Sequence, residues 1–133
     1  MDAQTKTIAQ NCLTASYEAT MDFPEIVGAL IKAGFDGYLV DYRRSTTTYY
    51  LPDGDNVELP NVKTPGLVAA IFAAEVVEAN VRQAQAKTPG YTYKGFCEKV
   101  KAAGCAGYLV SFLGKRVVYY GRTGETHVEH FPQ

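Results

Sequence analysis

Two pairs of adjacent tyrosines are the first residues whose type and spacing suggest chemistry. Tyr49-Tyr50 and Tyr119-Tyr120 stand 70 positions apart in a chain that has ten tyrosines, six phenylalanines and no tryptophan. Neighbouring residues of a strand point to opposite faces of a sheet, so one ring of each pair is expected inside and one outside. The outer rings either pack on the sheet surface or form an aromatic surface for a ligand.

The second group of interest is a short acid–base run near the C-terminus. His127 and His130 flank Glu129, and on a strand His127 and Glu129 share one face while His130 takes the other. A metal site needs three or four converging ligands, so we predict no metal here. Aligned with the first half of the chain, His130 takes the place of Leu59, which predicts a buried core histidine.

The three cysteines favour a structural role. Cys97 and Cys105 occupy the positions of Val27 and Phe35 in the first half, and Cys12 has no nearby cysteine. The count is odd, and no CxxC motif or Cys/His cluster occurs. Small buried thiols commonly replace apolar residues. A nucleophilic role would need a neighbouring base, which the sequence does not name. We therefore expect three reduced thiols and no disulfide.

Charged residues after the first predicted strand occur in one half only. Asp41, Arg43 and Arg44 have no charged counterparts 70 positions later. Such asymmetry arises when one face of a duplicated scaffold specialises, and also by ordinary surface drift. If the protein binds a ligand, we expect it at the seam between the two halves. The candidate ligand-binding residues are Asp41, Arg43, Tyr50, Tyr120 and His127.

These residues belong to an internal repeat. Phe23–Val40 aligns with Tyr93–Val110 at an offset of 70 without a gap, and Gly54 then falls on Gly124. One inserted residue brings Val57-Glu58 onto Val128-Glu129. The register holds across a predicted helix, a turn and a hairpin, which predicts a tandem duplication. We expect one domain over 1–133, built of repeats at about 1–60 and about 64–133.

Each repeat predicts two helices followed by three antiparallel strands. In the first repeat, Asp22 and Glu25 form a capping-box pattern, and Gly34 is placed to end the helix as a left-handed residue. In the second, Thr64-Pro65 resembles a helix start. The fold class is therefore α+β, a duplicated helix–helix–meander unit. The predicted helices span about 4–17, 23–33, 64–86 and 93–103, and the predicted strands about 38–43, 47–51, 56–59, 108–112, 116–121 and 126–131.

Composition excludes several classes of partner. The formal net charge is −1 and the pI about 6.1, without the basic excess that nucleic-acid binders usually carry. The most apolar run, Leu67–Val77, is too short to cross a bilayer and contains Glu75. The N-terminus lacks the apolar stretch of a signal peptide. We expect a cytoplasmic protein that binds neither nucleic acid nor membranes.

Several of these motifs together resemble a known family. They are Phe23-Pro24, Ala33-Gly34, Gly37–Tyr42 and Thr48–Gly54 in the first half, and Phe96-Cys97, Ala103–Tyr108, Val118–Tyr120 and Val128–Gln133 in the second. The sequence is similar to an uncharacterised bacterial family of small proteins of unknown function, some labelled phage envelope protein or YbcV-like. The resemblance covers Phe23 to Gln133. Its motifs are helix stops, strand aromatics and turn glycines, so it implies a fold and no catalytic residues.

Two functions remain open from the sequence. The first is a non-catalytic binding or interaction module for a small molecule or peptide, without a cofactor. The alternative is a small enzyme or stress-response protein that acts on a small molecule by proton transfer through Tyr, His or Asp. No P-loop, GxGxxG, GxSxG or HExxH motif occurs, which argues against common cofactor enzymes. A deep cleft with converging titratable groups would favour the enzyme.

Overall fold

The structure, a computed structural model, describes residues 1–132 and has an α+β fold. Its first half contains α1 (Ala3–Glu18), α2 (Phe23–Lys32), β1 (Gly37–Asp41), β2 (Thr46–Tyr50) and β3 (Asn56–Pro60). Its second half contains α3 (Ala74–Gln85), α4 (Tyr93–Ala102), β4 (Cys105–Ser111), β5 (Arg116–Gly121) and β6 (Thr126–His130). The predicted fold class is confirmed, and both halves share one element order.

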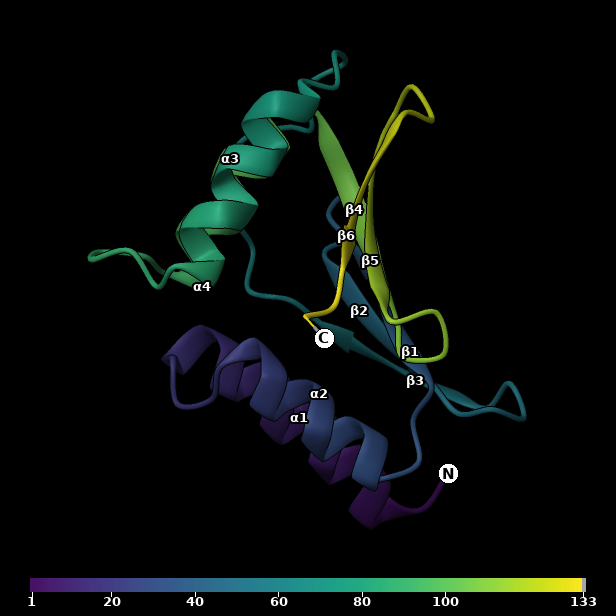
Figure 1. The fold of residues 1–133 in the computed structure, drawn as a ribbon. Coiled ribbons are helices and arrows are strands. Elements are labelled where there is room, and N and C mark those ends of the chain that lie inside the picture. The colour runs from purple at the N-terminus through teal and green to yellow at the C-terminus, as the bar shows by residue number, and fades with distance from the viewer. Residues whose placement is uncertain (133) are drawn as a thin grey trace.

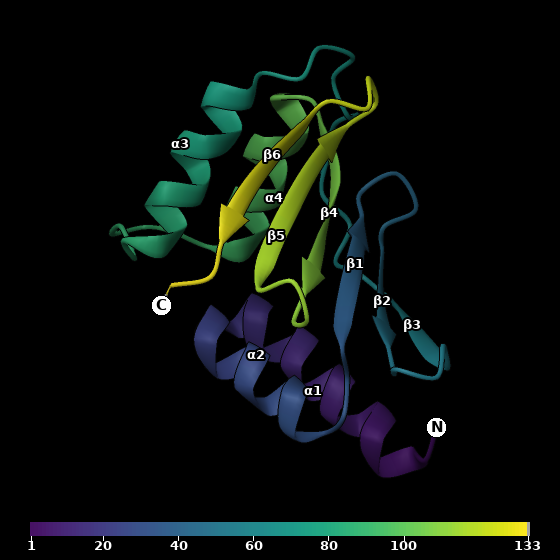
Figure 2. The same ribbon diagram turned by 45° about the vertical axis from the view of Figure 1, so that its right-hand side comes forward.

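The six strands form one antiparallel sheet in the order β3-β2-β1-β4-β5-β6. All four helices lie on one side of this sheet as two pairs, α1 with α2 and α3 with α4 (Figures 1 and 2). The sheet therefore has one covered face and one open face. This symmetric strand order accords with the predicted duplication, which stays a prediction about the origin of the chain.

The helix ends follow the local sequence signals. The Asp22 carboxylate accepts a hydrogen bond from the Glu25 amide, and the Glu25 carboxylate accepts one from the Asp22 amide, which completes the predicted capping box. At the other end of α2, Gly34 has φ +99°, and the Phe35 amide donates to the Leu30 carbonyl oxygen. Gly104 follows α4 with φ +92°. The left-handed conformation predicted for Gly34 is confirmed, and Gly104 shares it.

The two halves meet where β1 pairs with β4. Leu39 lies opposite Leu109 at the centre of this ladder. A Cβ atom added to Gly37 would collide with the Val110 carbonyl oxygen, and one added to Gly107 would collide with the Val40 carbonyl oxygen. These two glycines stand 70 positions apart. Glycine at both places therefore permits the close approach of the central strands.

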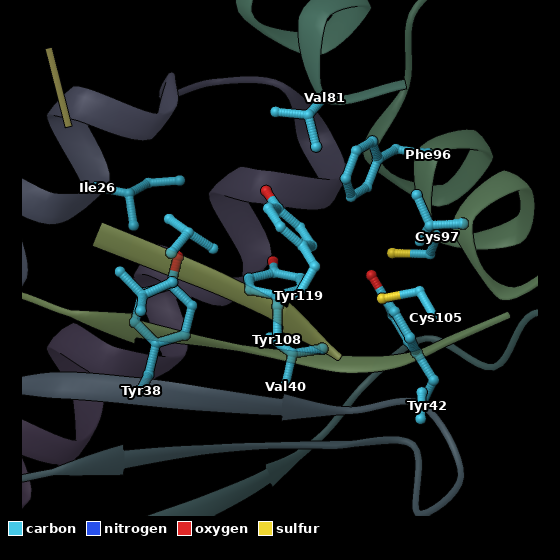
Figure 3. Close-up of a cluster of buried hydrophobic side chains, with 14 of the residues drawn as sticks. Ile26, Tyr38, Val40, Tyr42, Val81, Phe96, Cys97, Cys105, Tyr108 and Tyr119 are labelled. Atoms are coloured by element: carbon cyan, nitrogen blue, oxygen red, sulfur yellow. The ribbon is translucent and has the colours of Figure 1, made fainter. Parts of the chain in front are cut away.

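The core lies between the helices and the covered face, and it is rich in tyrosine (Figure 3). Tyr38, Val40 and Tyr42 point inward from β1 and its turn, and Tyr49 and Tyr119 are the inner members of their pairs. The rings pack edge to face or tilted, with Tyr38 and Tyr108 centroids 6.4 Å apart. Tyr93 and Tyr108 share a hydrogen bond through their hydroxyl groups. The core thus satisfies some phenol groups internally.

The helix predicted over 64–86 is wrong in its first ten residues. Residues 61–73 form an irregular strap with bends and no helix, and α3 begins only at Ala74. The Lys101 ammonium donates to the Thr64 carbonyl oxygen and hydroxyl, and the amides of Ala69 and Ala73 donate to carbonyl oxygens of Lys101 and Ala103. These tertiary bonds at the end of α4 replace the helical bonds that Thr64-Pro65 would start.

The inserted residue inferred before Val128 is also wrong. Tyr49 pairs with Val57 in the first half, and Tyr119 pairs with His127 in the second, so the offset of 70 continues to the last strand. A one-residue shift in a strand exchanges its two faces. His130 is consequently exposed on the open face rather than buried, and Glu129 takes the inward position of Leu59.

The two left-handed glycines provide a matched stability test. Gly34 has open space where a Cβ would lie, whereas a Cβ on Gly104 would overlap the backbone of Ile71 and Phe72 in the strap. We expect Gly34→Ala to lower the free energy of unfolding by about 1 kcal/mol, the cost of its positive φ. Gly104→Ala should cost at least about 2 kcal/mol because overpacking adds to that cost. Urea unfolding measures both, and equal losses would contradict the strap contact.

Candidate functional site

Asp41 has a structural task at the end of β1. Its Oδ1 accepts hydrogen bonds from the amides of Arg43 and Arg44, at 3.0 and 3.1 Å. The equivalent Ser111 accepts from the Gly114 amide at 2.8 Å through its hydroxyl group. An acid and a hydroxyl therefore cap equivalent turns, as short polar side chains commonly do.

Arg43 lines a hollow of about 320 Å³ together with Leu67, Val68 and Arg122. Arg43 follows β1 and Arg122 follows β5, while the strap supplies the apolar pair. Arg122 Nη1 donates to the Val68 carbonyl oxygen at 3.0 Å, which ties the strap to the β5–β6 turn. Leu67 is 90% exposed. Neither guanidinium group forms an ion pair within residues 1–132.

Tyr120 lies on the open face near this hollow. It pairs with Gly107, and its phenol lies directly over that glycine. Partial burial raises the pKa of Tyr120, the negative charge of Asp41 raises it further, and the positive charge of Arg43 opposes the shift. The phenol therefore stays protonated at neutral pH and is available as a neutral hydrogen-bond donor.

The five candidate residues do not converge. Asp41, Gly107 and Tyr120 follow one another across β1, β4 and β5 in one row, and Arg43 lies just beyond it. Tyr50 pairs with Gly37 at the opposite end of β1. His127 pairs with Tyr119, whose ring is in the core, and so lies on the covered face. The seam itself is the continuous β1–β4 ladder rather than a cleft.

A buried carboxylate lies on the covered face instead. Glu129 is 7% exposed, and its two oxygens contact Arg82 Nη1 and His127 Nε2, each at 2.6 Å. Gln85 Nε2 adds a longer contact of 3.4 Å. This cluster fastens α3 to β6, because Arg82 and Gln85 belong to the helix and the other two residues to the strand. A buried charge is tolerated when it is paired and hydrogen-bonded in this way.

The thiols are free and buried, as the pattern of apolar substitution predicts. Cys97 and Cys105 lie near the Tyr42 hydroxyl in the core (Figure 3). Burial raises the pKa of both thiols to about 11. They are therefore protonated at neutral pH and poor nucleophiles. The Tyr42 hydroxyl is buried without a hydrogen-bond partner among the described residues.

Two further observations concern residues 1–132. Within that range, no group of three or more His, Cys, Asp or Glu side chains is placed to hold a metal ion. No helix there is long and apolar enough to cross a membrane.

Sequence reasoning missed Arg122, Arg82 and Gln85. Arg122 could have been noticed as a basic residue in the turn between Gly121 and Gly124. Arg82 and Gln85 carried no signal, because only the packing of α3 against β6 brings them to Glu129.

The buried carboxylate makes a testable contribution to stability. Glu129→Gln should lower the free energy of unfolding by about 1.5–3 kcal/mol, because charge-assisted hydrogen bonds are lost in a buried place. Glu78 also contacts Arg82, but at 3.4 Å and with its side chain 47% exposed. Glu78→Gln should therefore cost less than about 0.5 kcal/mol. Chemical unfolding of both variants measures the difference, and similar losses would contradict a stabilising role for the buried cluster.

Comparison with known proteins places the chain in a family without assigning it an activity. No curated protein matches the chain. One family model matches residues 13–129, from α1 to the last strand. The matched range includes the end of α1, the other three helices, the strap and nearly the whole sheet, and both arginines of the hollow lie within it. The chain therefore belongs to the family described as Protein of unknown function (DUF1398).

Proposed function

We propose that this protein is a non-catalytic module that binds a small carboxylate or phosphate bearing an apolar group. The observation that carries the proposal is the hollow where Arg43 and Arg122 meet an exposed leucine without any ion-pair partner within residues 1–132. Guanidinium groups suit planar anions because they donate paired hydrogen bonds. Leu67 offers apolar contact for the rest of the ligand.

The neighbouring groups support orientation of such a ligand. Arg122 is held by its bond to the Val68 carbonyl oxygen, so part of its entropy is lost before any ligand arrives. The Tyr120 phenol lies in the row next to Arg43 and can donate one further hydrogen bond. The net charge of −1 does not favour a polyanion. A small monoanion suits the hollow better.

The alternative, proton transfer through Tyr, His and Asp, has less support. Tyr120 and Asp41 are on the open face, whereas His127 is on the covered face and bonded to Glu129. Asp41 already accepts two backbone hydrogen bonds. General acid–base catalysis needs its groups within hydrogen-bond reach of one substrate. The three side chains have no such common point.

A bacterial origin and a cytoplasmic location belong to the same proposal. The sequence resembles bacterial proteins, some of them labelled phage envelope protein or YbcV-like. Three buried free thiols are typical of a reducing compartment.

The binding proposal is tested with hexanoate as the probe and the neutral hexanamide as its matched control. In an amide-resolved NMR titration, hexanoate should shift the signals of Arg43, Leu67 and Arg122 in a saturable way, and hexanamide should not. Arg43→Gln and Arg122→Gln should each weaken binding about tenfold or more, the effect of losing one charge-assisted hydrogen bond.

Arg116→Gln is the matched control variant, because Arg116 is exposed, bonds to the Gly114 carbonyl oxygen and does not line the hollow. It should bind hexanoate like the parent. Shifts that never saturate, or equal weakening by all three variants, would overturn the proposal. Inorganic phosphate in a separate titration distinguishes a phosphate from a carboxylate site.

A further inference from the structure

The open face of the sheet carries a continuous apolar row. Leu39 of β1 pairs with Leu109 of β4, which pairs with Val118 of β5, which pairs with Val128 of β6. Leu109 is 41% exposed and Val128 38% exposed. The four helices lie on the other side, so no described element covers this row (Figures 1 and 2). A contiguous apolar surface of this kind marks an interaction site.

We propose that two copies of this chain associate through their open sheet faces, with the two-fold axis running along the strands. Aligned stacking of two antiparallel sheets is a common way to bury such faces. The four residues that line the arginine hollow are not among the open-face residues of this contact, so the hexanoate titration and the dimerisation experiment test different side chains.

The charges of the face fit a second copy in this orientation. Rotation about this axis places each strand over its counterpart from the other half of the second copy, β5 over β2 and β4 over β1. Arg116 then lies over Tyr50 of the second copy, because both belong to the row that contains Gly37 and Ser111. A guanidinium over a phenol ring is attractive. The contact forms twice, once from each copy.

No like charges meet in this arrangement. Asp41 lies over Gly107 of the second copy, since both occupy the row on the other side of Leu39. Glu58, at the β3 edge, lies over Val128 and is already paired with Arg44 at 2.8 Å. Leu39 lies over Leu109 at the centre. The centre of the face therefore meets its own apolar residues, and Arg116 meets an aromatic ring, which is the self-matching that an isologous interface requires.

The available area favours a reversible dimer rather than a permanent one. Six strands of about five residues cover about 29 Å by about 17 Å. Two such faces remove about 1,000 Å² or somewhat more of surface from water, close to the lower end of specific interfaces at about 1,200 Å². The side chains of the apolar row are then exposed to solvent in the monomer and covered by the partner's sheet in the dimer.

Sedimentation equilibrium over a range of protein concentrations tests the association directly. The parent should dimerise with a dissociation constant below about 0.5 mM. Leu109→Glu should weaken dimerisation about 100-fold, since it places carboxylates in the centre of the contact. Arg116→Ala, a milder change, should weaken it about tenfold by removing both ring contacts.

Ile31→Glu is the matched control, because Ile31 is 52% exposed on α2, away from the open face; it should dimerise like the parent. Circular dichroism establishes whether each variant is folded. If Leu109→Glu does not fold, the dissociation constant of Arg116→Ala tests the proposal instead. A parent that stays monomeric at about 0.5 mM, or face and control variants with equal effects, would overturn the proposal.

Discussion

The antiparallel pairing of β1 with β4 holds the two halves of the fold together. This ladder joins two three-stranded units into one six-stranded sheet, and it continues past both ends through bonds from the Tyr42 amide to the Ala106 carbonyl oxygen and from the Phe112 amide to the Asp36 carbonyl oxygen. Gly37 and Gly107 allow the strands to approach. Without the ladder, each unit would expose two sheet edges and half of a core, which small sheets rarely tolerate.

The joined sheet has consequences for both candidate surfaces. The continuous covered face holds one tyrosine-rich core under both helix pairs. The inner rings of the two tyrosine pairs, Tyr49 and Tyr119, pack in this core. The open face keeps the outer rings and a row of aliphatic side chains. The arginine hollow forms at one end of the sheet, where turns from the two halves and the strap come together. Both candidate surfaces, the apolar row and the arginine hollow, therefore lie on the open face or at its rim.

Much of the fold could be predicted from the sequence, because local signals and tertiary packing agree over most of the chain. The capping pair Asp22 and Glu25 marked the start of α2, and Gly34 marked its end. The helix predicted to start at Thr64 is absent because the Lys101 ammonium binds Thr64, and this tertiary hydrogen bond overrides the local helix signal. The Val-Glu match that suggested an insertion was misleading, because register in a sheet is set by pairing rather than by residue identity. Of the site, Arg43 and Tyr120 were found, whereas Arg122 was not.

The β1–β4 ladder should make the two halves one cooperative unit. Native-state hydrogen exchange, resolved by amide and measured at several low urea concentrations, can detect this cooperativity. We expect the amides of β2 in the first half and β5 in the second to open with one free energy, equal to that of global unfolding, together with the amides of Tyr42 and Phe112. Opening of either half at a lower free energy while the other stayed protected would show that the halves are separate units.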